Sequence, residues 1–177
     1  MTFTETVVLL DPDGVPTGTA DKASVHTHET PLHLAFSCHV LDAEGRVLVT
    51  RRALSKVTWP GVWTNSVCGH PGPDEAFEDA VRRRARHELG IELHDIELTD
   101  PDFRYRAVDA SGIVEHEVCP VFTARTADEV RPNPDEVMEF AWVEVDDLRA
   151  AVRAAPWALS PWLVSSAATV PLLGGSR

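Results

Sequence analysis

The chain has 177 residues, of which 44% are hydrophobic and 25% charged, and this composition suits one domain with an apolar core. Its formal net charge of −12 argues against nonspecific binding to nucleic acid, which depends on a basic surface. No apolar run approaches the ~18 residues of a membrane span, and the N-terminus lacks the basic start of a secretory signal. We therefore expect a cytoplasmic protein with no nucleic-acid or membrane partner.

The first part of the chain predicts short strands joined by turns. The sequence Asp11-Pro12-Asp13-Gly14 is a strong turn, and Asp42-Ala43-Glu44-Gly45 predicts the tip of a hairpin. A loop is expected between Ser55 and Gly61. The strands that these breaks delimit cover residues 7–10, 34–41, 46–51 and 63–69.

A helix is predicted in the middle of the chain. Its start is indicated by Pro71-Gly72-Pro73-Asp74, where a proline and an acidic cap are expected, and its end by Gly90. Phe77, Val81 and Ala85 recur every four residues, so one face of this helix should lie against the core.

The last part of the chain adds strands and two further helices. Strands are expected at 103–108, 113–123 and 140–143, and helices at 146–154 and from Ser160-Pro161 through Trp162. This mixed order predicts an α/β (α+β) fold, in which a mixed β-sheet sandwich is flanked by helices in one domain over residues 1–177. Its core should extend from about residue 5 to 165, with a loose tail from about 171.

Strand parity brings together residues that could hold a metal. Glu115 and Glu117 lie two apart and share one face of a strand, while Cys68 and His70 share a face of another. Imidazole and carboxylate groups suit divalent first-row metals, so the histidines at 26, 28 and 33 are further candidates. A solvated acidic face is the ordinary alternative. The three cysteines, Cys38, Cys68 and Cys119, lack zinc-type spacing and are expected to be free thiols.

The segment from Gly69 to Ile91 resembles a Nudix box, with Glu88 in one of its acidic positions. Arg84 and His87 stand at two places where this motif has glutamates that hold Mg²⁺. The loss of two carboxylates argues against diphosphate hydrolysis and leaves an anion site beside Glu88 as one interpretation. An ordinary i, i+4 surface ion pair between Arg84 and Glu88 is the alternative.

Several segments together closely resemble the type I isopentenyl-diphosphate Δ-isomerases, a family with a Nudix-like fold. The resemblance covers most of the chain, from about Leu9 to Trp162. The segments that carry it are 32–37, 50–56, 59–71, 105–107, 112–120 and 160–162, and the longest of them reads Trp-Pro-Gly-Val-Trp-Thr-Asn-Ser-Val-Cys-Gly-His-Pro.

This resemblance implies a set of site residues. The implied ligands of a divalent metal, Mn²⁺, Mg²⁺ or Zn²⁺, are His26, His33, His70, Glu115 and Glu117. Glu88 would help to bind Mg²⁺ that arrives with the substrate diphosphate, which Lys22, Arg52, Lys56 and Arg84 would also hold. Cys68 and Glu117 would lie on opposite faces of the substrate, with Tyr105 aiding proton transfer and Trp162 covering the hydrocarbon. His28 matches no ligand.

The implied reaction interconverts isopentenyl diphosphate and dimethylallyl diphosphate, by protonating and deprotonating opposite faces of the substrate through a tertiary carbocation. The resemblance favours Glu117 with Tyr105 as the acid and Cys68 as the base, although the residues alone leave open which group acts at C4 and which at C2. The expected partner is a small prenyl diphosphate, and nothing indicates more than a monomer. A Nudix diphosphate hydrolase, or a non-catalytic diphosphate- or metal-binding module, is the alternative.

Overall fold

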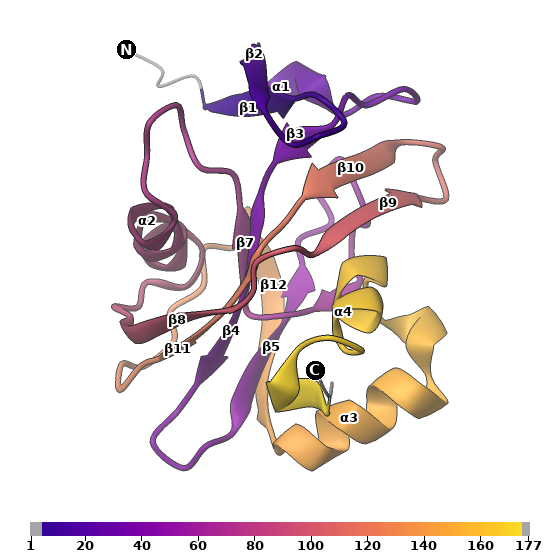
Figure 1. Cartoon of the computed structure of the whole chain (residues 1–177). Coiled ribbons are helices and arrows are strands. Elements are labelled where there is room, and N and C mark those ends of the chain that lie inside the picture. The colour runs from indigo at the N-terminus through magenta and orange to yellow at the C-terminus, as the bar shows by residue number, and fades with distance from the viewer. Residues whose placement is uncertain (1–4, 175–177) are drawn as a thin grey trace.

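The computed structural model describes residues 5–174, which form two β-sheets with helices on both sides (Figure 1). The first sheet has the strand order β2-β1-β3-β10-β9 and the second β12-β5-β4-β11-β8, with β6 on β5 and β7 on β4. The strands of the first sheet are β1 (Thr6–Leu10), β2 (Pro16–Asp21), β3 (His33–Leu34), β9 (Arg104–Val108) and β10 (Val114–Val118). The strands of the second are β4 (Phe36–Leu41), β5 (Val47–Arg52), β6 (Trp63–Thr64), β7 (Val67–Gly69), β8 (His94–Asp100), β11 (Val121–Arg125) and β12 (Val137–Val143).

Helices cover the two faces of the second sheet. On one face, α2 (Phe77–Leu89) buries Val81, Ala85 and Leu89 against β4 and β5. On the other, α3 (Val145–Ala154) and α4 (Pro161–Ser166) pack on β5 and β12 through Leu148 and Leu163. The short elements are α1 (Lys22–Val25), η1 (Pro156–Ala158) and η2 (Pro171–Leu173). The α/β (α+β) sandwich with flanking helices is confirmed, and no helix among residues 5–174 is long and apolar enough to cross a membrane.

Two predicted strands each divide where the chain passes from one sheet to the other. Residues 34–41 break at Ala35, between β3 and β4, and residues 113–123 break at Cys119-Pro120, between β10 and β11. The two crossings run in parallel, because β3 pairs with β10 and β4 with β11. Backbone bonds from Ala35 and Ser37 to the carbonyl groups of Val118 and Pro120 bridge the break. Proline has no N–H, which helps to explain the end of the ladder there.

The predicted strand 63–69 is also divided, and it lies as a wedge between β4 and β5. These two strands pair at Leu41 and Val47 and then diverge, with β6 filling the gap on β5 and β7 on β4. Between β6 and β7, the Ser66 hydroxyl accepts a bond from the Val40 N–H and donates one to the Leu48 carbonyl. One side chain thus replaces the ladder bonds that the diverging strands lose, and the next residues carry Cys68 into the pocket.

Several elements differ from those expected. Helix α2 begins at Phe77 and not near Asp74, because Asp74 has a left-handed backbone (φ 60°) and Glu75 instead binds the Gly72 N–H. Strands β2 and β8, with few apolar residues, were not expected. Of the tail expected to be loose from about residue 171, residues 171–173 form η2 and Leu173 is buried beside α3 and α4, whereas residues 175–177 lie outside the described residues. The predicted glycine end of α2 is confirmed, with Gly90 at φ 66°.

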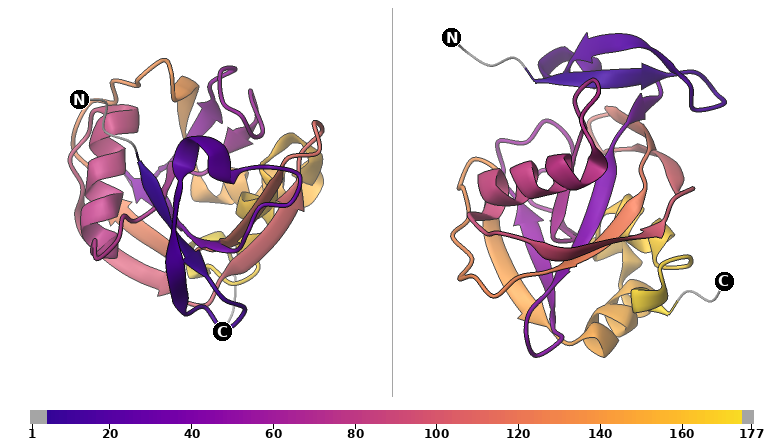
Figure 2. Two further views of the ribbon diagram at one scale, coloured as in Figure 1. Left: turned by 90° about the horizontal axis from the view of Figure 1, so that it is seen from above. Right: turned by 60° about the vertical axis from the view of Figure 1, so that its left-hand side comes forward.

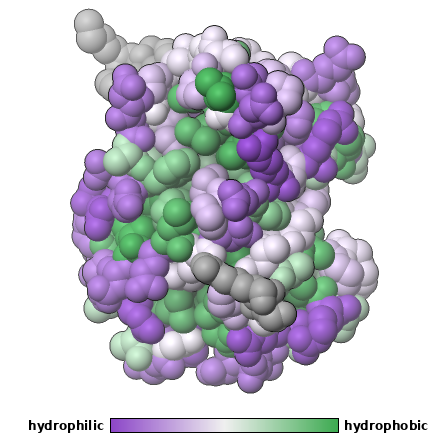
Figure 3. All heavy atoms as spheres, viewed as in Figure 1, coloured by the Kyte–Doolittle hydropathy of each residue, from purple (hydrophilic) through white to green (hydrophobic). Residues whose placement is uncertain are grey.

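The N-terminal elements form a cap at one end of the molecule. Figure 2 shows β1, β2 and α1 lying across the end of the sandwich that α2 and β10 approach. On the face seen in Figure 3, hydrophilic side chains lie along much of the outline and apolar ones gather between them. The cap matters because it supplies Glu5, Lys22 and His26 to the pocket described next.

Candidate active site

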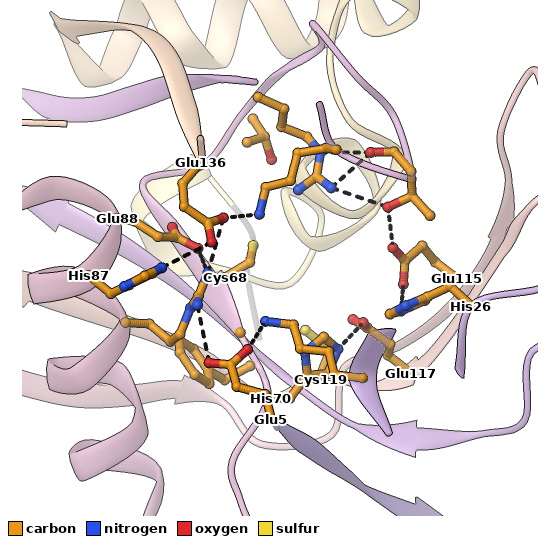
Figure 4. A pocket seen from close by; sticks show the side chains of 18 of the residues that line it. Glu5, His26, Cys68, His70, His87, Glu88, Glu115, Glu117, Cys119 and Glu136 are labelled. Carbon is orange, nitrogen blue, oxygen red and sulfur yellow. Dashed lines mark hydrogen bonds and ion pairs between the residues drawn. The ribbon is translucent and has the colours of Figure 1, made fainter. Parts of the chain in front are cut away.

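One pocket of about 1140 Å³ contains nearly all the residues that the sequence singled out (Figure 4). Its walls come from the cap, from β7 and β10, from the loop after β5, from α2 and from α4. The predicted residues that line it are Lys22, His26, Arg52, Lys56, Cys68, His70, Arg84, Glu88, Tyr105, Glu115, Glu117 and Trp162. His33 is fully buried behind this wall.

At one end, three imidazoles and a carboxylate converge. His26, His33, His70 and Glu117 each present a ligand atom within 4.8 Å of the others. The strands explain the convergence, because His33 and Glu117 are directly paired in register between β3 and β10. His33 Nδ1 donates a hydrogen bond of 2.9 Å to the Pro31 carbonyl oxygen, and this bond orients the ring with Nε2 toward the cluster, 3.4 Å from Glu117 Oε1.

The donor atoms of this cluster fit a divalent cation. His26 Nε2, His33 Nε2 and Glu115 Oε2 are buried and have no hydrogen-bond partner among residues 5–174. Glu115 lies outside the group of four, but its Oε2 is 3.0 Å from His26 Nε2. Buried polar atoms rarely remain unpaired, and a shared ion would satisfy all three. Burial lowers the pKa of His70 to about 4, which leaves its ring in the neutral form that metals bind.

Cys68 lines the same pocket, on β7. Its Sγ is 3.2 Å from Asn65 Oδ1 and 3.8 Å from the Ser37 hydroxyl. Burial, and next the negative charge of Glu88, raise the pKa of the thiol to about 12. Cys68 is therefore protonated at neutral pH in the free site.

Glu117 and Tyr105 form a hydrogen-bonded pair on neighbouring strands. Their positions are opposite each other in the β9–β10 register, and the Tyr105 hydroxyl donates to Glu117 Oε2 at 2.8 Å. Burial opposes ionisation of Glu117, but contacts with His33 and His70 outweigh it and hold its pKa well below the usual range. Burial and the Glu117 charge raise the pKa of Tyr105 well above its ordinary value, so the hydroxyl keeps its proton.

Trp162 forms an aromatic wall over this part of the pocket. Ser160 caps α4 and Pro161 occupies its first turn, which places Trp162 inward with only 3% of its surface exposed. Its ring packs 5.8 Å from Tyr105 and 5.5 Å from Trp59, measured between centroids. The guanidinium carbon of Arg52 lies 5.4 Å from the ring centroid, within the range of a cation–π contact.

Asn65 connects the aromatic wall to Cys68, a role that was not predicted. Its Oδ1 accepts hydrogen bonds from the Trp162 indole, the Thr64 hydroxyl and the Cys68 thiol. Its amide nitrogen donates to the carbonyl groups of Cys38 and Val67, which fixes the orientation of the amide. No pattern in the sequence distinguishes a buried asparagine that orients other side chains, so only the three-dimensional arrangement could identify it.

At the opposite end, basic side chains meet carboxylates. Lys22 is bonded to Glu5, Lys56 to Glu136, and Arg84 to Glu88. Arg84 also lies 3.3 Å from Glu136 and 3.4 Å from Glu5. Arg84 is 2% exposed, so the surface ion pair considered for Arg84 and Glu88 is wrong, and the pair is buried.

Glu5 and Glu136 were not identified from the sequence. Burial opposes ionisation of both, but Lys22 acting on Glu5, and Arg84 with Lys56 acting on Glu136, lower the pKa of each to about 2. Their roles could not be anticipated because each lies far along the chain from its partners. The Glu136 carboxylate also lies 3.2 Å from His87 Nε2, at the edge of the site.

Comparison with known proteins identifies the family. The NUDIX domain family matches residues 31–163. A protein of Agromyces mediolanus called isopentenyl-diphosphate Delta-isomerase is 66% identical over 97% of this chain and 83% of its own length. A protein of Escherichia coli with the same name is 59% identical, over 93% and 91%. The chain belongs to the isopentenyl-diphosphate Delta-isomerase family of the Nudix superfamily.

Solved structures give the same fold for this isomerase family member. DR0079 from Deinococcus radiodurans superposes with a TM-score of 0.69 at 20% identity, covering 91% of this chain and 96% of the other. A MutT NUDIX hydrolase from Burkholderia pseudomallei gives 0.58 at 26% identity, over 82% and 98%. The two residues that depart from the Nudix box lie at different depths. Arg84 is inside the pocket, where it is paired with Glu88, and His87 is half exposed at the rim.

Two further histidines lie outside the site, and one of them is His28, which was excluded from the predicted ligands. His28 is exposed, and its Nδ1 lies 2.9 Å from the Gly112 carbonyl oxygen. His116 has the opposite strand parity to Glu115 and Glu117 and is absent from the pocket walls.

Proposed function

We propose that the protein interconverts isopentenyl diphosphate and dimethylallyl diphosphate. Relatives that are 58–66% identical over most of the chain bear that enzyme's name. The observation that carries the proposal is the order of groups in one pocket. The His/Glu cluster, which includes Glu117, lies at one end, basic residues lie at the other, and Cys68 lies between them. Trp162 lines the same pocket.

The basic end would bind the diphosphate. Lys22, Lys56 and Arg84 supply positive charge there, and Glu88 would take part in holding Mg²⁺ that accompanies the substrate. Because each cation already has a carboxylate partner, the diphosphate must compete with Glu5 and Glu136 or share their partners. This local charge explains how a chain at −12 could bind an anion.

Cys68 and the Glu117–Tyr105 pair would transfer the protons. The substrate alkene must gain a proton at C4 and lose one at C2, so one acid and one base are needed on opposite sides. A divalent ion held by the cluster would fix the Glu117 carboxylate and tune its acidity. In the free site Cys68 is a thiol and Glu117 a carboxylate, the reverse of the states that Glu117 as acid and Cys68 as base require. Protonation in the pocket must therefore change before turnover in that direction.

Trp162 and Tyr105 would protect the tertiary carbocation. The faces of aromatic rings attract positive charge, an effect worth ~2 kcal/mol when water is excluded. The apolar residues around them, among them Phe103 and Val121, keep this part of the pocket dry. Dryness matters because water would trap the cation as an alcohol.

Proton NMR of the protein with isopentenyl diphosphate and Mg²⁺ in D₂O tests the proposal. We expect signals of dimethylallyl diphosphate to grow, deuterium to enter the substrate carbons and no phosphate to be released. Release of phosphate or pyrophosphate without isomerisation would favour a hydrolase. A metal-loaded sample that leaves the substrate unchanged would favour a binding module.

A further inference from the structure

Thr58 lines the pocket beside Glu115 and belongs to neither group of predicted residues. It is 4% exposed, in the loop between β5 and β6. Its carbonyl oxygen accepts bonds from Arg52 Nε at 3.1 Å and Arg52 Nη2 at 2.8 Å. Its hydroxyl lies 3.2 Å from Arg52 Nη2 and 2.6 Å from Glu115 Oε1.

The direction of these bonds follows from the chemistry of the three groups. A guanidinium can only donate, and an ionised carboxylate can only accept. The Thr58 hydroxyl therefore accepts from Arg52 and donates its single proton to Glu115 Oε1. Glu115 Oε2 is left without a hydrogen-bond partner in the described chain, 3.0 Å from His26 Nε2. The hydroxyl thus turns the free oxygen of Glu115 toward the His/Glu cluster.

The backbone beside Thr58 is held in a strained form. Trp59 has a left-handed backbone (φ 43°), which is unfavourable for a bulky residue. Such strain persists where several contacts impose it. Here the Trp59 N–H donates a hydrogen bond of 3.4 Å to Asp109, and the Trp59 ring packs on Trp162. Arg52 also donates to the carbonyl oxygen of Thr58, the residue before Trp59. These contacts fix the position of the Thr58 hydroxyl relative to the Glu115 carboxylate.

We propose that Thr58 is a positioning residue that orients Glu115 as a metal ligand and links the His/Glu cluster to Arg52. The inference rests on the proposed function only in treating the cluster as a metal site. The link runs from His26 through Glu115 and Thr58 to Arg52, which lies over the face of Trp162. Outer partners of this kind affect metal affinity by roughly 10–100-fold. A change in Arg52 should therefore reach the metal through Thr58.

The test measures the binding of Mn²⁺ alone, and of Zn²⁺ alone, to the metal-stripped full-length protein. Thr58→Val keeps the side-chain shape and removes the hydroxyl, and Thr58→Ser keeps the hydroxyl. We expect T58V to weaken binding of the ion about tenfold or more and T58S to stay within about threefold of the wild type. Thermal unfolding of each variant verifies that the protein is folded.

A second arm tests the link to Arg52. Arg52→Gln should weaken ion binding in the wild-type background and have little further effect in the T58V background, because the link is already cut. Equal effects of R52Q in both backgrounds, or wild-type ion affinity in T58V, would overturn the inference. Failure of the wild-type protein to bind either ion would overturn it as well. No substrate is present in these measurements, so a failure of the isomerase assay is a separate result.

Discussion

The two ends of the pocket are built on opposite principles. At the His/Glu cluster, donor atoms point at one another and several have no partner within residues 5–174. At the basic end, Lys22, Lys56 and Arg84 are each neutralised by a carboxylate of the same chain. The first arrangement is prepared to receive a cation, whereas the second must rearrange to receive an anion. We therefore expect substitutions at the two ends to affect different measurements.

The largest effect should come from Cys68, which lies between the ends. Cys68→Ala removes a proton-transfer group, and we expect turnover to fall by about 10²–10⁴-fold or more. Metal content and thermal unfolding should remain close to those of the wild type, because within residues 5–174 the thiol is bonded only to Asn65 and weakly to Ser37. NMR turnover assays and elemental analysis measure both. Wild-type turnover in C68A would remove Cys68 from the mechanism.

Substitution of Glu117 should give the next largest effect, because Glu117 is predicted both to bind the metal and to transfer a proton. Glu117→Gln removes the charge that His33 and His70 face, so metal affinity should fall roughly 10–100-fold together with turnover. The matched variant Tyr105→Phe keeps the carboxylate and should lower turnover while leaving metal affinity unchanged. Metal titration and turnover assays separate the two. Full metal occupancy in E117Q would leave Glu117 only its proton-transfer role.

Glu88 should give a smaller effect, confined to the basic end. Glu88→Gln should lower the affinity for the substrate by about tenfold, since one charged ligand is lost. The dependence of turnover on Mg²⁺ should also become weaker. The His/Glu cluster should keep its ion. The assay varies Mg²⁺ at several concentrations of isopentenyl diphosphate. An unchanged Mg²⁺ dependence would contradict the role given to Glu88.

The smallest effect concerns stability. The pKa of Glu136 is about 2 in the folded protein against 4.5 ordinarily, so its ion pairs stabilise the fold above about pH 5. That contribution is lost as the pH falls from about 5 toward 2, where the carboxylate takes up a proton. We expect Glu136→Gln to lower the free energy of unfolding by about 2 kcal/mol at pH 7, with the difference shrinking in acid. Urea unfolding at several pH values measures it, and a difference independent of pH would contradict this account.

The sequence predicted the residues that would take part in the chemistry better than it predicted the residues that hold them in position. Strand parity placed Glu115 with Glu117, and the structure indeed directs both toward the site. The fold class followed from alternating elements and from the resemblance. Neither located the strand breaks at Ala35 and Pro120, because the apolar pattern continues across both. Only the proline could have indicated the second break.

The supports were missed because they act across long separations in the chain. Thr58 and Glu115 are 57 residues apart, and Lys56 and Glu136 are 80 apart. No local sequence pattern identifies Thr58 as the residue that orients the Glu115 carboxylate, or Glu136 as the residue that neutralises Lys56. The helix start was wrong for a related reason, because Glu75 binds Gly72 and Arg83 instead of entering the first turn of α2.

The paired crossing of the strands has a mechanical consequence. His33 and Ser37 belong to one continuous segment, and Glu117 and Val121 belong to its parallel neighbour. The predicted metal ligands His33 and Glu117 therefore lie on the same two segments of backbone that support Cys68 through the Ser37–Cys68 pairing. The two groups proposed to transfer protons, Cys68 and Glu117, are therefore joined through paired strands and do not depend on separate loops.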